Sequence, residues 1–142
     1  MDAMEISRTG LDVEWRRLEV IAQNLANANT TRTGLGEPYR AMRLISGPRA
    51  GFGTHLSAGQ PGARPAGAAV YGIEPTQVAP RMVYEPGHPH ADAKGYVSYP
   101  GVDHAGEMTL MVHTARIYEA NLVAMNIARQ MYAKALELGR LG

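Results

Sequence analysis

Apolar side chains recur at helical spacing near both ends of the chain and lose that rhythm in the middle. From Glu107 to Leu138 they follow an alternating spacing of three and four residues. This spacing is typical of a helix that packs along a coiled-coil seam. Arg129 interrupts the seam once. The other seam positions are Met108, Met111, Ala115, Tyr118, Leu122, Met125, Tyr132 and Leu136.

A second apolar row runs along the same predicted helix on another side. It repeats every seventh residue and consists of Leu110, Ile117, Ala124, Met131 and Leu138. One partner helix can cover one seam but not two. The second row therefore predicts a further neighbour, and we expect this helix to belong to an assembly subunit rather than to an enzyme.

An N-terminal helix is predicted from Met4 to Ala28. Asp2 can cap it, and Glu5 completes a pattern similar to a capping box. Apolar residues recur every seventh position at Met4, Leu11, Leu18 and Leu25, with Trp15, Ala22 and Asn29 four residues after the last three. Because packing supplies most of the stability of such a helix, we expect it to pair with the C-terminal one.

The N-terminal helix runs into the asparagine-rich stretch from Asn24 to Thr31. Asparagine is a poor helix former, but its amide can bond to backbone groups. Two interpretations stay open for this stretch. It is either a fraying helix end followed by a turn, or a packing joint in which amides such as that of Asn27 satisfy backbone across a subunit contact.

The middle of the chain predicts short strands and loops. We expect strands at Tyr39–Ser46, Ala69–Glu74, Gln77–Tyr84 and Gly95–Tyr99, with a Gly/Pro-rich loop at 47–69. The fold class is therefore mainly α with a small β-rich insert. The predicted parts are an N-terminal coiled-coil helix (1–30), a loop- and strand-containing middle region (31–103) and a C-terminal coiled-coil helix (104–142). Because Gly106 disfavours the first helical turn, we expect the last helix to begin later or to bend there.

Composition narrows the function further. The 142 residues include no cysteine, which excludes disulfides and thiolate catalysis. The formal net charge is +1, and no run of about 18 apolar residues exists that could span a bilayer. The first residues are acidic where a cleaved signal peptide would be basic. If the protein leaves the cytoplasm, we expect a route without a cleaved signal.

Candidate chemistry is sparse. His88, His90 and Asp92 alternate like metal ligands, but Pro89 disrupts the strand that would align them. Arg32–Arg81 holds six arginines and two glutamates, yet no aromatic stacking platform for nucleic acid accompanies them. We therefore expect no catalytic site, no cofactor, no metal, no nucleic acid and no small-molecule substrate.

Two stretches carry a family resemblance. Asn24–Thr31 and Tyr118–Met125 resemble the paired terminal signatures of the bacterial flagellar rod and hook axial proteins. Within that family, Arg32-Thr33, the segment Pro38–Arg40 and the run Tyr84–Asp103 resemble the proximal-rod C type. The chain departs from the family pattern at the Gly101–Gly106 joint and at His90, where an acid is common.

The resemblance implies a structural subunit of the flagellar proximal rod, the drive shaft that crosses the periplasm, transmits torque and encloses the export channel. Implied partners are copies of itself, other rod subunits, the inner-membrane ring and export-gate adaptor below, and the bushing ring around the rod. It implies export by the flagellar secretion apparatus without signal cleavage. The alternative is a non-polymerising helical-hairpin adaptor or secretion chaperone.

Seventeen positions are the predicted coiled-coil and subunit-interface residues. They are Met4, Leu11, Trp15, Leu18, Ala22, Leu25, Asn27, Met108, Met111, Ala115, Ile117, Tyr118, Asn121, Leu122, Met125, Met131 and Leu138.

Overall fold

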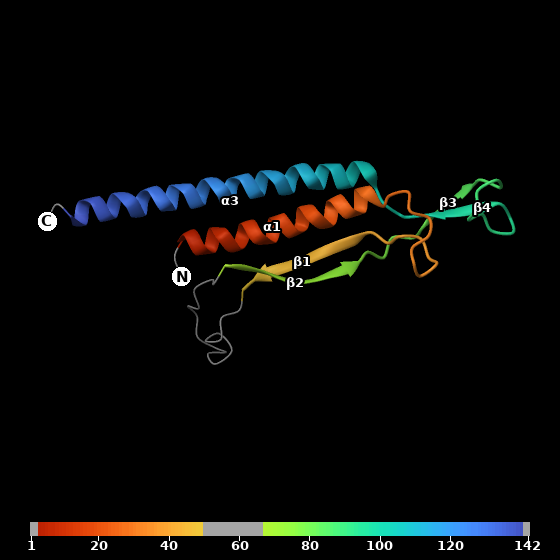
Figure 1. Cartoon of the computed structure of the whole chain (residues 1–142), viewed down its shortest axis with the longest axis horizontal. Coiled ribbons are helices and arrows are strands. Elements are labelled where there is room, and N and C mark those ends of the chain that lie inside the picture. Colours follow the sequence, from red (N-terminus) through yellow and green to blue (C-terminus); the bar gives the residue numbers. More distant parts are fainter. Residues whose placement is uncertain (1–2, 50–66, 141–142) are drawn as a thin grey trace, which may run out of the picture. The chain divides into compact units, whose positions relative to one another are not determined.

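The described part of the chain, residues 3–49 and 67–140 of a computed structural model, contains two long helices and four short strands joined by turns and loops (Figure 1). This confirms the predicted mainly helical class with a small β insert. The predicted division into parts at 1–30, 31–103 and 104–142 stays a prediction. The elements are α1 (Ala3–Ala26), β1 (Met42–Pro48), β2 (Ala68–Pro75), β3 (Arg81–Tyr84), β4 (Tyr96–Tyr99) and α3 (His104–Gly139).

Residue contacts divide the chain into two compact units. The first consists of Met1–Arg16, Ile45–Gly72 and Thr114–Gly142, and the second of Arg17–Leu44 and Ile73–His113. The helices α1 and α3 and the strands β1 and β2 each contribute residues to both units. The hairpin of β3 and β4 belongs to the second unit alone.

In the first unit, α1 and α3 pack side by side in opposite directions. The rings of Trp15 and Tyr118 lie 6.2 Å apart between centroids. Five residues earlier on α1, a Cβ added to Gly10 would lie 3.0 Å from Oδ1 of Asn121, so contacts move toward the end of α3 as they move toward the start of α1. On the strand side of α1, the hydroxyl of Thr9 accepts the backbone N–H of Ala68 at 3.0 Å. The helix α1 is therefore in contact with both α3 and β2.

The second unit holds most of the buried apolar side chains among the described residues, namely Val20, Ile21, Ala41, Leu44 and Val97. The hairpin of β3 and β4 is antiparallel and pairs Val83 with Val97. The carboxylate of Asp92 accepts the backbone N–H groups of Lys94 and Tyr96, each at 2.8 Å. These bonds hold the turn that leads into β4.

The strands β1 and β2 form an antiparallel pair. At one end the N–H of Arg49 donates to the carbonyl of Gly67, and at the other the N–H of Thr76 donates to the carbonyl of Ala41, each at 2.8 Å. The predicted loop at 47–69 is shorter at both ends than expected, because β1 continues to Pro48 and β2 begins at Ala68. Its centre, 50–66, lies outside the described residues.

The helix α3 begins at His104, so the prediction that Gly106 delays its start is wrong. The backbone N–H of Glu107 donates to the carbonyl of Asp103 at 2.8 Å and closes the first turn. A Cβ at Gly106 would collide with the Asp103 carboxylate. The glycine therefore leaves room for the side chain of the residue that precedes the helix.

Candidate functional site

The end of α1 is joined to β1 by a buried asparagine. Asn24 has no exposed surface, and its amide pairs with the backbone of Met42 in both directions. Oδ1 accepts the N–H of Met42 at 2.8 Å, and Nδ2 donates to its carbonyl at 2.9 Å. The side chain therefore satisfies one residue of β1 as a neighbouring strand would. The hydroxyl of Tyr39 donates to the same Oδ1 at 2.9 Å.

The start of α3 joins the same cluster through Glu107, which is 1% exposed. Its Oε2 accepts Nδ2 of Asn24 at 3.1 Å, and its Oε1 forms an ion pair with the guanidinium of Arg43. All four hydrogen-bonding positions of the Asn24 amide are thus used. We call Asn24, Tyr39, Arg43 and Glu107 the polar node.

The node also affects a titratable group. Burial, and then the neighbouring carboxylate of Glu107, raises the pKa of Tyr39 above its ordinary value. Both causes favour the neutral phenol, because an ionised Tyr39 would be desolvated and would lie near a negative charge. The hydroxyl therefore remains a donor to Asn24 at neutral pH.

The contacts of the polar node help to distinguish the two interpretations of the asparagine-rich stretch, Asn24–Thr31. The amide of Asn24 does satisfy backbone, but it does so within one chain. The amide of Asn27, which directly follows the end of α1, donates to the carbonyl of Gln23 in the last turn of that helix at 2.9 Å. The contact between Asn24 and Glu107 was not predicted from the sequence. The available signal was that Asn24 follows the apolar Val20 and Ile21 by four and three residues, on the side of α1 that is buried.

The predicted interface positions of α1 divide by burial. Leu11 is buried. Met4, Leu18, Leu25 and Asn27 are half-buried, and Trp15 and Ala22 are exposed. The most buried row of α1 instead includes Val13, Val20, Ile21 and Asn24. A simple coiled-coil reading underestimates this row because α1 contacts strands as well as a helix.

The predicted positions of α3 divide in the same way. Met111, Ala115, Tyr118, Asn121 and Met125 are half-buried. Met108, Ile117, Leu122, Met131 and Leu138 are exposed. The covered row also includes polar residues that an apolar pattern does not reveal, because Glu107 and Thr114 are its most buried members.

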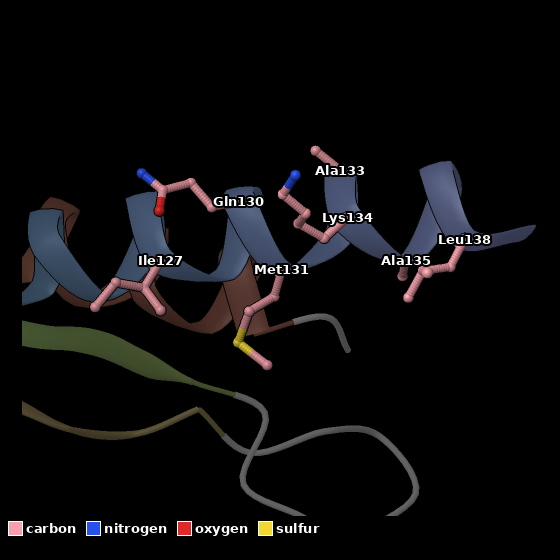
Figure 2. Close-up of a pocket in the computed structure, with 7 residues that line it drawn as sticks. All are labelled: Ile127, Gln130, Met131, Ala133, Lys134, Ala135 and Leu138. Atoms are coloured by element: carbon pink, nitrogen blue, oxygen red, sulfur yellow. The ribbon is translucent and has the colours of Figure 1, made fainter.

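The last part of α3 has a largely apolar side that the described residues leave open. The contact of Gly10 with Asn121 places Ala3, the first residue of α1, opposite about Ala128. The segment from Arg129 to Gly139 continues beyond α1 (Figure 1). Figure 2 shows Ile127, Met131, Ala135 and Leu138 projecting to one side of this segment, with Gln130, Ala133 and Lys134 on the other.

We call Ile127, Met131, Ala135 and Leu138 the open apolar row. Met131 is 69% exposed and Leu138 is 72% exposed. Tyr132 and Leu136, one residue further round the helix, are also exposed. Lone exposed apolar residues are common, but a contiguous row of them usually marks an interaction site.

In the histidine-rich turn, the Nδ1 atoms of His88 and His90 have hydrogen-bonding partners within the chain. Nδ1 of His88 accepts the backbone N–H of His90 at 3.0 Å, and Nδ1 of His90 lies 2.8 Å from the hydroxyl of Thr31. Across residues 3–49 and 67–140, no group of three or more His, Asp or Glu side chains has metal-binding geometry. Within the same residues, no helix is long and apolar enough to cross a membrane.

Comparison with known families gives the class of protein. Residues 4–32 match the family model described as "Flagella basal body rod protein", and residues 93–138 match the model described as "Flagellar basal body rod FlgEFG protein C-terminal". The two matches cover α1 and almost all of α3, the helices that the polar node joins. They identify the class as flagellar basal-body rod proteins.

Full-length relatives are more specific. The chain is 37% identical over 140 residues to the flagellar basal-body rod protein FlgC of Escherichia coli O157:H7, covering 99% of this chain and 98% of that protein. It is 36% identical over 145 residues to FlgC of Bacillus subtilis, covering 97% of each chain. The chain therefore belongs to the FlgC family of flagellar basal-body rod proteins. It is a structural rod protein of the basal body and not an enzyme.

Proposed function

We propose that this chain is a subunit of the proximal rod, which transmits torque across the periplasm and encloses the export channel. The observation that carries the proposal is the open apolar row on α3. It extends past the start of α1, and its exposed Met131 and Leu138 lack cover among the described residues. Neighbouring subunits of a polymer would supply that cover.

A drive shaft needs stiffness in twist, which close-packed side chains provide because packed interiors deform little. Four of the eight methionines lie in α3, at Met108, Met111, Met125 and Met131. Their unbranched side chains adapt to irregular surfaces. This adaptability suits a subunit that meets several different neighbours in one short rod.

The proposed partners follow from family membership and from the apolar surface. They are copies of this chain and other rod subunits, the inner-membrane ring and export-gate adaptor below, and the bushing ring around. We propose that the protein reaches the rod through the flagellar secretion apparatus without signal cleavage. On α3, the exposed residues Ile117, Leu122, Met131 and Leu138 are the proposed contacts to other subunits, while the half-buried ones pack on α1.

A charge placed in the open apolar row tests the proposal. We expect Met131→Asp to abolish swimming and to leave the chain out of rods, because a carboxylate buried at a subunit contact has no partner. The variant is expressed in a strain from which the gene for this chain has been deleted. Motility is measured in soft agar, and the protein content of purified basal bodies shows whether the variant is incorporated.

Gln130→Asp is the matched control, since it places the same charge on the opposite side of the same helical turn (Figure 2). We expect it to support swimming. Normal rods containing the Met131→Asp chain would contradict the proposal. So would absence of the unmodified chain as a stoichiometric component of purified basal bodies, which is the result expected for a non-polymerising adaptor.

A further inference from the structure

The apolar pattern of the two long helices does not by itself select one pairing. The helix α1 has 24 residues and α3 has 36, so α3 offers room for more than one alignment. Many α3 positions that face α1 have a similar residue seven positions later, as Met111 is followed by Tyr118, Met125 and Tyr132. A shift of α1 by seven residues, about 10 Å along α3, would therefore keep the apolar contact.

Glu107 breaks this repetition. It is the buried acid of α3, and the residue seven positions later is Thr114. In the structure the Glu107 carboxylate accepts a hydrogen bond from Asn24 and pairs with Arg43. In a shifted alignment both contacts would be lost, and the buried Glu107 carboxylate without its partners is strongly unfavourable.

In the observed alignment, the hydroxyl of Thr114 is fully buried and has no hydrogen-bond partner among the described residues. The shifted alignment would place Asn24 opposite Thr114, where the amide could satisfy that hydroxyl. The shift would therefore gain a hydrogen bond for Thr114. The observed alignment is favoured only if its own polar contacts are stronger, and these are the contacts of Glu107 with Asn24 and Arg43.

We propose that Glu107 sets the register of α1 on α3 through Asn24 and Arg43. A buried polar contact that fixes the alignment of otherwise repetitive helices is a known use of such groups. The register in turn determines how far α3 continues beyond α1, from Arg129 to Gly139. This last consequence rests on the proposed function, because it assigns that segment to neighbouring subunits, whereas the register itself is a property of one chain.

Cysteine pairs can report the register, since the chain has no cysteine of its own. Gly10→Cys with Asn121→Cys reports the observed alignment, because a Cβ at Gly10 would lie 3.0 Å from the side-chain oxygen of Asn121 and a disulfide needs such a close approach. Gly10→Cys with Ala128→Cys, combined with Asn121→Ala to remove the close contact at Gly10, reports the alignment shifted by seven residues. Disulfides within one chain are formed with an added thiol oxidant, because cytoplasmic thiols stay reduced, and are measured on non-reducing gels. The protein comes from purified basal bodies and from the soluble pool of the same cells.

The decisive variant moves the acid by seven residues, as Glu107→Thr combined with Thr114→Glu. In the unmodified background we expect the first pair to form in preference to the second by roughly tenfold or more, given the cost of leaving the buried Glu107 carboxylate without partners. In the transplanted variant we expect the preference to reverse. Glu119→Thr, which removes an exposed acid of α3, is the control and should keep the original preference.

Two results would overturn the inference. The transplanted variant could keep the original preference, which would show that apolar packing sets the register. Both pairs could instead form weakly and equally, which would show that Glu107 is needed for pairing itself rather than for its alignment. A reversed preference supports the register role whether or not rods assemble, because the disulfides are read within single chains. If the transplanted variant fails to assemble into rods and keeps the original disulfide preference, the register role is wrong and the proposed function is unaffected.

Discussion

The polar node and the open apolar row are opposite in character, although α3 contributes to both. The node is polar and buried, with Asn24 and Glu107 almost without exposed surface. The row is apolar and exposed, most strongly at Met131 and Leu138. Ordinary burial preferences are reversed in both places. We infer that polar contacts specify how one chain folds, whereas apolar surface is left for the contacts between chains.

Under the proposed function, the two regions differ because the partners of the polar node lie in the same chain, whereas those of the open apolar row lie in neighbouring subunits. A buried polar group is tolerated only when its hydrogen bonds are made, and Asn24 makes all of its bonds within the chain. An exposed apolar row becomes favourable once a neighbour covers it, because apolar surface is then removed from water. If this division holds, substitutions in the node should lower the stability of the chain, and substitutions in the row should affect assembly alone.

The largest loss of stability is expected for Asn24→Ala. Removing the amide leaves the hydroxyl of Tyr39, one oxygen of Glu107 and the backbone of Met42 without these bonds. Since each buried polar group without a partner costs about 1–3 kcal/mol, we expect the free energy of unfolding to fall by about 3 kcal/mol or more. The measurement is urea denaturation of the purified chain followed by circular dichroism.

Met131→Lys is the comparison for that measurement, because it alters the open apolar row. Surface substitutions away from buried contacts usually change stability by less than about 0.5 kcal/mol, and we expect the same here. Equal losses for Asn24→Ala and Met131→Lys would show that the row belongs to the folded core of one chain. The division between folding and assembly would then be wrong.

A smaller loss is expected at the close approach of the two helices. A Cβ at Gly10 would lie 3.0 Å from the side-chain oxygen of Asn121 and 3.1 Å from its carbon and nitrogen. The larger, branched side chain of Gly10→Val would push α1 and α3 apart. Overpacking of this kind costs about 1–3 kcal/mol, and thermal denaturation should show it as a lower midpoint.

A double-mutant cycle identifies the cause of that loss. Alanine is favoured over glycine within a helix by up to about 1 kcal/mol. With Asn121→Ala in the background the clash disappears, so Gly10→Ala should stabilise the chain there and gain less in the unmodified protein. Identical effects of Gly10→Ala in the two backgrounds would contradict the close contact.

Sequence patterns predicted the parts of this fold that depend on local periodicity. The spacing of apolar residues gave both helices, and turn residues gave the β insert between them. The alignment of α1 with α3 was not predictable, because a seven-residue repeat fits several registers equally well. The partners of Asn24 were equally hidden, since they lie 18 and 83 positions away in the chain at Met42 and Glu107.

The prediction that α3 begins after Gly106 failed for a different reason. Intrinsic propensity counts Gly106 as unfavourable, but propensity takes no account of the side chain that precedes the helix. In the structure the Asp103 carboxylate occupies the place that a Cβ of residue 106 would need. The predicted interface positions form a set of apolar rows, and their contacts with other subunits stay a prediction. Which row faces which neighbour depends on the strands that cover the other side of α1. The seven-residue repeat of the helix does not reveal where these strands pack.

The smallest effect that we expect from the polar node is its response to alkaline pH, through Tyr39. Burial and the Glu107 carboxylate raise the pKa of this phenol, so the folded chain keeps the proton at pH values where the unfolded chain, with an ordinary pKa of about 10, loses it. The hydroxyl therefore contributes its full stability below about pH 10, and the contribution disappears as pH rises through the elevated value. Compared with Tyr39→Phe, the unmodified chain should be more stable by about 1 kcal/mol at neutral pH, and this advantage should shrink above about pH 10. Urea denaturation of both chains at a series of pH values measures the difference, with Tyr132→Phe at an exposed position of α3 as the control. An advantage that stays constant into strongly alkaline solution would mean that Tyr39 is not held by the node, and the polar half of the comparison would lose one of its four members.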